Sequence, residues 1–498
     1  MVELIALFVI LALLLFSAER PGVWRSVVWT GILLFLPWII AAQVEQAWPQ
    51  IVPHWFWMPP LRVPLLLWPI LVVLSVRFPT KREAILDVCS AILAFFALSS
   101  VLVLGQFLWF WWSARALNRP IETRPVVTAS AAVGKPRIIF IVMDELSYQQ
   151  VYEHRYAGLQ LPTFDTLAAD STVFTDVTPT ANHTELAIPA LFSGRPVEDF
   201  SATASGMLLT RSAEKDPWQR FNATDTVFAD ALKDGRRTAV VGWYNPYCRI
   251  MPDVLDTCYW TDAYNVQGGL TSEGSFKFNL ISSADYAFHG QKLREDLARK
   301  LHLSVKFDHT TTGAHLHDFL RLEPVTDKVL LDPSAGFTFI HLPIPHPDGI
   351  YNRRTRQMTT EPSTYVDNLA LADAYLAHMR ALLEKSGQWD SSTVLLMGDH
   401  GWRTSLVWMK FPEWSPEEQL ASLGGTFDTR PAYIVKLAGQ KTGMRIDEPF
   451  NAIRTRALID ALMAGNIRSP DDLKAWVDGG RASGNQQFTA AGIVSGVN

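Results

Sequence analysis

The sequence is poor in cysteine and carries no large surplus of charge. Three of its 498 residues are cysteines, and 44 lysines and arginines nearly balance 49 aspartates and glutamates, for a formal net charge of −5. Nucleic-acid-binding proteins usually carry a strongly basic patch, so this balance argues against a nucleic-acid partner. The cysteines form no Cys-x-x-Cys pair and have no histidine at a matching spacing, which argues against a zinc knuckle.

Two of the cysteines lie close together in the segment YCRIMPDVLDTCYW. They are Cys248 and Cys258, and they form either a short disulfide loop or two free thiols. We favour the disulfide, which requires an oxidising compartment. The third cysteine, Cys89, lies in an apolar run and is expected to be a small core residue.

Long apolar runs are concentrated at the start of the chain. They extend roughly over Val2–Phe16, Val27–Val44, Val63–Val76 and Ala84–Trp112, and most of the 18 tryptophans lie in the first quarter of the chain. A membrane-spanning helix needs about 20 mostly apolar residues, and tryptophan is enriched at membrane interfaces. Residues 1–114 are therefore predicted to form a transmembrane region of about four helices. The first run could be a signal peptide instead, but its start, MVELIALF, lacks the expected lysine or arginine.

The positive charges between the runs predict the orientation of this region. The second link contains only Arg62, whereas the first and third links hold Arg20, Arg25, Arg77, Lys81 and Arg82. Because cytoplasmic links are the positive ones, the first and third links are expected to face the cytoplasm. Residues 115–134, without periodicity, are predicted to be a linker. Residues 135–498 would then form a domain outside the cytoplasmic membrane, in agreement with the favoured disulfide.

Short apolar strands alternate with helical patterns in residues 135–498, which predicts a doubly wound α/β domain. A helical stretch is YVDNLALADAYLAHMRALLEKSG, and two amphipathic helices are expected near the C-terminus. The histidine-containing segment DHTTTGAHLHDFL is expected to be a surface insertion. The predicted strands lie in PRIIFIVMDELS, TAVVGWY, GFTFIHLPIPHPDGIYN, SSTVLLMGDHGWR and PAYIVKL.

Metal-binding residue types follow three of these strands. Asp144 follows the first, His346 the third, and Asp399 and His400 the fourth. The carboxyl ends of parallel strands share one edge of a sheet, where such folds bind ligands, so we expect these side chains to meet. Asp144 could equally be the N-cap of a helix. Carboxylate and imidazole groups suit zinc or manganese better than calcium.

The segment ANHTELAIPALFSGR offers a nucleophile for such a metal site. Its apolar part predicts a helix that begins at Thr184. A helix N-terminus favours a phosphate-like anion, and a metal lowers the pKa of a bound hydroxyl, so Thr184 could attack as an alkoxide. Thr184 could also serve only as an N-cap.

Together, these motifs resemble the alkaline phosphatase superfamily, and in particular its sulfatase-like membrane enzymes, the phosphoethanolamine transferases and lipoteichoic acid synthases. The resemblance covers residues 135–439. It rests on five segments in the family's order: IIFIVMDELS, HTELAIPALFSG, HLPIPHPDGIYN, LLMGDHGWR and RPAYIVKLAGQ.

The resemblance implies a role for each matching residue. Thr184 would be the nucleophile, and one divalent metal, zinc before manganese or calcium, would be held by Asp144, Thr184, Asp399 and His400. His346 would bind substrate oxygens or protonate the leaving group, and Arg403 and His183 would contact the substrate. Glu145 would support the metal or replace Asp144 as its ligand, whereas His341 would be a structural neighbour.

The implied activity is transfer or hydrolysis of a phosphoester at the bacterial cytoplasmic membrane, on its periplasmic side. A phospholipid would donate phosphoethanolamine or phosphoglycerol, and an envelope glycan or lipid would accept it. Sulfatases carry a cysteine or serine nucleophile, followed by proline two and arginine four residues later; here Leu186 and Ile188 follow Thr184. The alternatives are therefore a sulfuric-ester hydrolase, disfavoured by these residues, and a catalytically silent membrane protein that binds or senses a ligand.

Overall fold

The computed structural model describes residues 135–202, 208–261, 310–404, 415–426 and 428–482, together with shorter segments of the first 112 residues. The chain divides into two compact units. The first comprises residues 1–112 and 268–308, and the second comprises residues 113–267 and 309–498. Each is described by itself below.

The described part of the first unit consists of helical segments, and polar side chains form hydrogen bonds and ion pairs between them. They include residues 23–34 and helix α3, Pro59–Ser75. The buried Arg82 donates to the Ser26 carbonyl at 2.8 Å, and Arg25 pairs with Glu83 at 3.1 Å. Within the described residues, no helix combines the length and the apolar character that crossing a membrane requires. Most of the four predicted runs, and Cys89, lie outside these residues, so the membrane region stays a prediction.

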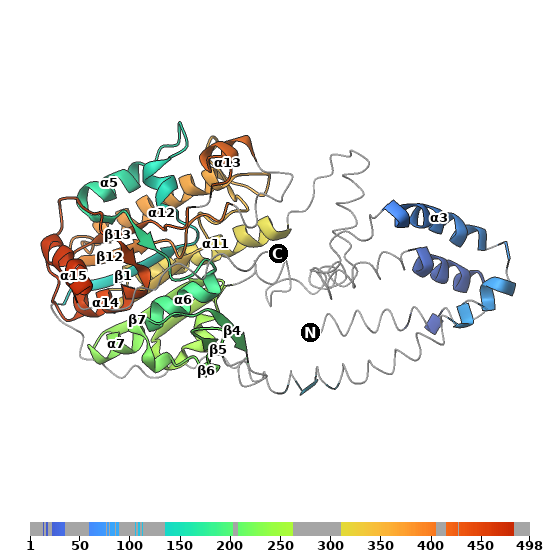
Figure 1. Ribbon diagram of the computed structural model, residues 1–498, viewed down its shortest axis with the longest axis horizontal. Helices are drawn as coiled ribbons and strands as arrows, with labels where there is room; N and C mark the ends of the chain where they lie inside the picture. The colour runs from blue at the N-terminus through green and yellow to red at the C-terminus, as the bar shows by residue number, and fades with distance from the viewer. Residues whose placement is uncertain are drawn as a thin grey trace. The chain divides into compact units, whose positions relative to one another are not determined.

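The second unit is built on an eight-stranded sheet in the order β14-β2-β13-β12-β1-β9-β7-β8 (Figure 1). The five strands from β12 to β8 are parallel, β13 is antiparallel to β12, and β2 is antiparallel to β13. The α/β class is thus confirmed, although the sheet is mixed at one end. The strands are β1 Arg137–Met143, β2 Thr172–Phe174, β7 Arg237–Trp243, β8 Thr257–Thr261, β9 Ala335–Leu342, β12 Ser392–Met397, β13 Tyr433–Lys436 and β14 Met444–Ile446.

Strand β1 shows why this sequence places its sheet between two layers of helices. All seven of its residues are buried, and successive side chains of a strand point to opposite faces. Phe140 joins the hydrophobic cluster under α6, α7, α14 and α15, whereas Ile141 joins the cluster under α5 and α12. The helices on the two faces are α5 Pro162–Asp170, α6 Thr184–Ser193, α7 Val227–Lys233, α12 Tyr365–Lys385, α14 Thr455–Met463 and α15 Pro470–Ala482 (Figure 1).

The prediction for DHTTTGAHLHDFL was wrong, because most of that segment is part of a core helix. Helix α11, Thr310–Leu331, packs against β7 through Leu322 and Val329. His315 is fully buried and lies between two backbone carbonyls, at 2.8 Å from Asp348 O and 2.6 Å from Pro343 O. The polar residues of this segment obscured the apolar face of the helix in the sequence.

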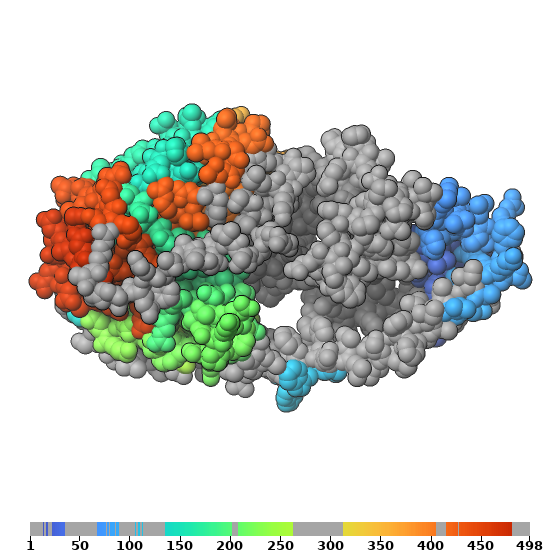
Figure 2. Space-filling view, viewed as in Figure 1, coloured from blue at the N-terminus to red at the C-terminus, as the bar shows by residue number. Residues whose placement is uncertain are grey.

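Smaller elements surround the sheet. The structure joins Cys248 and Cys258 in a disulfide with a Cα–Cα distance of 5.7 Å, which links helix α8, Tyr247–Ile250, to strand β8. On the face shown in Figure 2, segments around β4–β6 (green) and α14–α15 (red) form part of the surface. The remaining elements include β3 Val177–Thr178, β4 Asp199–Ala202, β5 Leu208–Arg211, β6 Gln219–Arg220, β10 Tyr351–Asn352, β11 Gln357–Met358, β15 Phe450–Asn451 and α13 Pro416–Ala421.

Candidate active site

Two fully buried carboxyl groups follow β1 at the carboxyl edge of the sheet. Asp144 and Glu145 have no exposed surface, and the Asp144 N–H donates to the Leu342 carbonyl at 3.0 Å. Glu145 has a φ of 60°, a left-handed conformation that costs energy for a residue with a side chain. Such strain persists where the surrounding structure imposes it, often at functional sites. Here Tyr365 helps, because its hydroxyl donates to the Glu145 carbonyl at 2.7 Å.

Thr184 is the first residue of α6, and its hydroxyl lies between two carboxylates. Thr184 Oγ1 is 3.1 Å from Asp144 Oδ2 and 2.8 Å from Asp399 Oδ2.

The N-terminus of α6 lies beside this hydroxyl. His183 is the N-cap of α6, so the first-turn N–H groups of the helix lie next to the Thr184 hydroxyl. A threonine placed here can be both the start of the helix and a nucleophile beside an anion-binding helix end.

Asp399 and His400 follow β12 in a turn that requires glycine on both sides. A Cβ at Gly398 would lie 2.4 Å from the Leu146 carbonyl oxygen, and one at Gly401 would lie 2.2 Å from the Asp428 carbonyl oxygen. Asp399 Oδ1 accepts from the backbone N–H groups of Glu145 and His400, at 3.0 and 2.9 Å. These two bonds leave Oδ2 directed at Thr184.

His341 of β9 completes the cluster, although the sequence suggested only a structural neighbour. Its Nε2 lies 3.5 Å from Asp144 Oδ2, and its Nδ1 lies 2.7 Å from the Tyr247 hydroxyl. Potential ligand atoms of Asp144, His341 and Asp399 all lie within 4.8 Å of one another. His400 Nε2 lies on the same side, 3.2 Å from Asp399 Oδ2.

The chemistry of this cluster fits a divalent cation. Asp144 Oδ1, His341 Nε2 and His400 Nε2 are buried and have no hydrogen-bond partner among the described residues. Burial, and then the charge of Asp399, raises the pKa of Asp144 well above its usual range. Burial also lowers the pKa of His341 to about 4, so this imidazole is neutral and has a nitrogen lone pair for a metal. A buried group of carboxylates is costly unless a cation compensates it.

A second group of side chains lies beside the first. Arg403 donates from Nε to Glu145 Oε1 at 2.8 Å and from its backbone N–H to Oε2 at 3.1 Å, and its Nη1 lies 3.3 Å from Nδ1 of the exposed His183. Asp144, Glu145 and His346 could also hold a cation. The Arg403 guanidinium already neutralises Glu145, however, which favours the Thr184 side of Asp144 for the metal.

His346 is neutral and buried in this group. Burial lowers its pKa to about 3. Its Nδ1 lies 2.8 Å from the Pro347 carbonyl, which can only accept, so Nδ1 carries the ring hydrogen and Nε2 is the acceptor nitrogen. Nε2 lies 3.9 Å from Glu145 Oε1. In this protonation state Nε2 has no hydrogen to donate.

The sequence of this unit matches one family model over residues 138–456, described as type I phosphodiesterase / nucleotide pyrophosphatase. The chain belongs to this phosphodiesterase family. The match includes every candidate site residue from Asp144 to Arg403 and confirms the predicted membership of the alkaline phosphatase superfamily. The protein is therefore an enzyme of that metal-dependent superfamily. No curated protein matches this phosphodiesterase.

Several solved structures resemble this chain. A sulfatase, PsFucS1 from Pseudoalteromonas sp., is 14% identical with a TM-score of 0.44, covering 69% of this chain and 70% of its own. The lipoteichoic acid synthase LtaP from Listeria monocytogenes is 13% identical with a TM-score of 0.40, covering 70% and 77%. Murine ectonucleotide pyrophosphatase / phosphodiesterase 5, in complex with AMP, is 8% identical with a TM-score of 0.40, covering 68% and 99%.

One residue at the site of this phosphodiesterase escaped the sequence analysis. Tyr244 follows β7, has a φ of 71° and is half-buried. Burial, and then the Glu185 and Asp144 carboxylates, raises the pKa of its phenol to about 12. Its position directly after a buried strand, like that of Asp144, was the signal that could have identified it.

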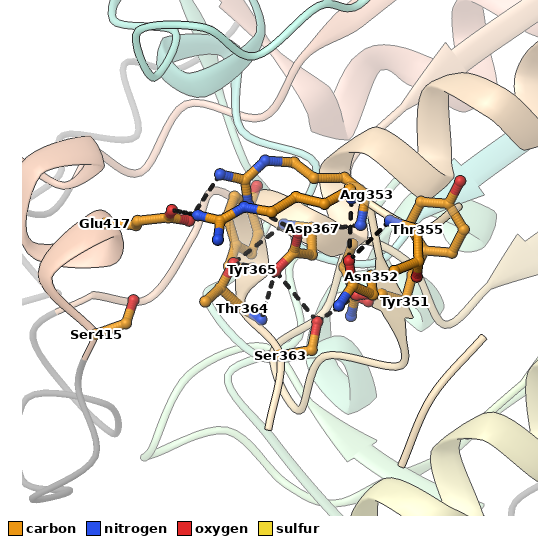
Figure 3. Close-up of polar contacts among 12 residues, drawn as sticks. Tyr351, Asn352, Arg353, Thr355, Ser363, Thr364, Tyr365, Asp367, Ser415 and Glu417 are labelled. Carbon is orange, nitrogen blue, oxygen red and sulfur yellow. Dashed lines mark hydrogen bonds and ion pairs between the residues drawn. The ribbon is translucent and has the colours of Figure 1, made fainter. Parts of the chain in front are cut away.

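The β9–α12 connection of the phosphodiesterase is held by an ion-pair network (Figure 3). Asp367 and Thr364 form a capping box at the start of α12, and Arg353 pairs with Asp367 at 2.7 Å and with Glu417 of α13 at 2.8 Å. Tyr365, which follows Thr364, stacks on Trp402 with ring centroids 4.1 Å apart. The network thus fixes the tyrosine that bonds the Glu145 carbonyl, one residue from Asp144.

Proposed function

We propose that this protein is a membrane-anchored phosphoester transferase or hydrolase that uses Thr184 as its nucleophile. A phospholipid headgroup phosphate, such as phosphoethanolamine or phosphoglycerol, would be the donor, and a hydroxyl of an envelope glycan or lipid, or water, the acceptor. The observation that carries the proposal is the Thr184 hydroxyl, 3.1 and 2.8 Å from two buried carboxylates at a helix N-terminus. The phosphodiesterase family match supports a phosphodiester over a sulfate ester.

Asp144, Asp399, His400 and Thr184 would hold the metal, with zinc preferred and manganese next. When bound, the cation would lower the pKa of the threonine hydroxyl and stabilise charge on the phosphoryl oxygens. The first-turn N–H groups of α6 face the same space and suit the phosphate oxygens. Arg403 and His183 lie at the edge of the site, where they can contact the substrate.

The chain's own residues can be assigned to two steps. First, Thr184 Oγ1 releases its proton to water and bonds to phosphorus while the bond from phosphorus to the donor's alcohol breaks, and the leaving oxygen takes a proton back from water. This leaves a phosphothreonine that carries the headgroup. Second, the acceptor hydroxyl bonds to phosphorus and its proton passes to His346 Nε2 while the bond to Thr184 breaks. Thr184 Oγ1 then takes up a proton, and His346 Nε2 releases one, through water. Because His346 is neutral, its Nε2 can accept the acceptor's proton and has none to give the leaving group in the first step.

The test is mass spectrometry of Thr184 in the detergent-purified full chain after incubation with phospholipids. Wild type and Thr180→Ala are expected to carry a headgroup-phosphate adduct on Thr184, whereas Thr184→Ala carries none. Thr180 is a matched control, because its hydroxyl bonds the Ala187 carbonyl at 3.1 Å beside the same helix. The adduct mass would identify the headgroup. Product formation by Thr184→Ala at the wild-type rate would contradict the covalent route, and turnover of nucleotide diesters alone would contradict a lipid donor.

A further inference from the structure

Tyr247 is a fully buried side chain outside the proposed catalytic machinery that contacts one of its members. Its hydroxyl lies 2.7 Å from His341 Nδ1, and the opposite nitrogen of that ring, Nε2, lies 3.5 Å from Asp144 Oδ2. His341 Nε2 is buried and has no hydrogen-bond partner among the residues that the structure describes. The Tyr247 phenol therefore contacts the His341 imidazole, which in turn lies next to the Asp144 carboxylate.

The position of Tyr247 is closely constrained. A Cβ at Gly242 would lie 2.2 Å from the Tyr247 ring, so the ring packs directly on the backbone of β7. Phe339 of β9 contacts it with ring centroids 5.6 Å apart. The next residue, Cys248, is bonded to Cys258 on the neighbouring strand β8. Contacts on several sides leave the phenol little freedom to leave His341.

The hydrogen-bond partners of the phenol decide what His341 can do. A phenol both donates and accepts, so the Tyr247 hydroxyl can either accept from His341 Nδ1–H or donate to Nδ1. If it accepts from Nδ1–H, Nε2 carries a lone pair toward Asp144. Histidines that bind metals usually donate their other ring N–H to an oxygen in this way, which fixes the ring.

We propose that Tyr247 is a positioning residue that orients His341 as an additional ligand to the divalent cation held by Asp144 and Asp399. The proposal rests on the metal dependence of the proposed function, but not on the identity of the substrate. In the competing arrangement, Tyr247 donates to Nδ1, Nε2–H donates to Asp144, and the pair is structural only. Metal affinity distinguishes the two arrangements, because it depends on the Tyr247 hydroxyl only if Tyr247 orients His341 as a ligand.

The experiment is a zinc competition titration of the metal-stripped full chain in detergent, without substrate. Tyr247→Phe is expected to bind zinc about 10- to 100-fold more weakly than wild type, and His341→Gln at least as weakly. Tyr433→Phe is the matched control. Tyr433, on β13, is also fully buried, and its hydroxyl bonds the Thr455 hydroxyl at 3.1 Å rather than a residue of the metal-binding cluster. Its zinc affinity is expected to equal that of wild type.

Two further readings separate a metal effect from a folding defect. Thermal unfolding of the metal-free variants shows whether each is folded at the titration temperature, and the visible spectrum of the cobalt-loaded proteins reports the ligand set. A changed spectrum in His341→Gln is expected. Wild-type zinc affinity in a folded Tyr247→Phe protein, or an unchanged cobalt spectrum in His341→Gln, would overturn the proposal.

The outcomes for the proposed function are separate. Zinc binding that depends on Tyr247, with no adduct on Thr184 and wild-type turnover in Thr184→Ala, would contradict the covalent transfer but leave the positioning role intact. An adduct on Thr184 together with unchanged zinc affinity in Tyr247→Phe would contradict only the positioning role.

Discussion

The buried ion pair between Arg403 and Glu145 makes a quantitative prediction about stability. Glu145 has no exposed surface, only 12% of the Arg403 side chain is exposed, and their closest N–O distance is 2.6 Å. Arg403→Met would keep most of the side chain's apolar stem but leave the carboxylate uncompensated, which typically costs about 3–5 kcal/mol. We therefore expect a loss of about 3–5 kcal/mol at pH 7.

The loss should depend on the charge of Glu145, because it comes from a buried carboxylate without a partner. The assay is equilibrium denaturation of the full chain in detergent at pH 7, with chelator present so that no cation replaces the guanidinium. Arg403→Met combined with Glu145→Gln should recover most of the loss. A loss under about 1 kcal/mol at pH 7, or no recovery in the double variant, would refute the reasoning.

Three further predictions follow from particular contacts. Gly242→Ala should destabilise the protein by about 1–3 kcal/mol and weaken zinc binding, because the new methyl group displaces the Tyr247 ring; unchanged thermal unfolding and titration curves would show that the ring yields freely. Burial, and then Asp230, raises the pKa of Asp460 to about 6, above its unfolded value of 3.8, so its penalty is absent below pH 3.8 and complete above pH 6. Asp460→Asn should therefore raise the melting temperature at pH 8 but not at pH 4, and an equal change at both pH values would exclude this cause. Chelation should lower the melting temperature of wild type, and added zinc should restore it, because a bound cation compensates Asp144 and Asp399; a chelator-insensitive melting curve would argue against a stabilising metal.

The central strands of the fold could be predicted because they are long and continuously buried. Strands β1, β7, β9 and β12 contain apolar runs bounded by turn residues, and each is found where the pattern indicates. Strand β14 has three residues, too few to form a pattern, and its pairing with β2 joins chain segments far apart in sequence. The buried face of α11 was missed because Gly313, Pro324 and its histidines interrupt the apolar spacing.

The candidate site also has a part that could be predicted from the sequence and a part that could not. The acidic and histidine residues at strand ends could be selected because parallel strands bring their carboxyl ends to one edge. What could not be predicted is the pairing of side chains across that edge. The ion pair of Arg403 with Glu145 joins residues 258 positions apart, and the contact of His341 with Tyr247 joins residues 94 apart. Neither partner has a local pattern that identifies the other.

The Cys248–Cys258 bridge has a consequence for how such an enzyme would mature. It lies one residue from the phenol that we propose orients His341, and it fastens that residue's helix to strand β8. In a reducing cytoplasm the thiols would remain apart and the phenol would be held less firmly. Oxidation of the two cysteines would then come before full metal binding. A newly made chain would hold its cation more weakly until the bridge forms.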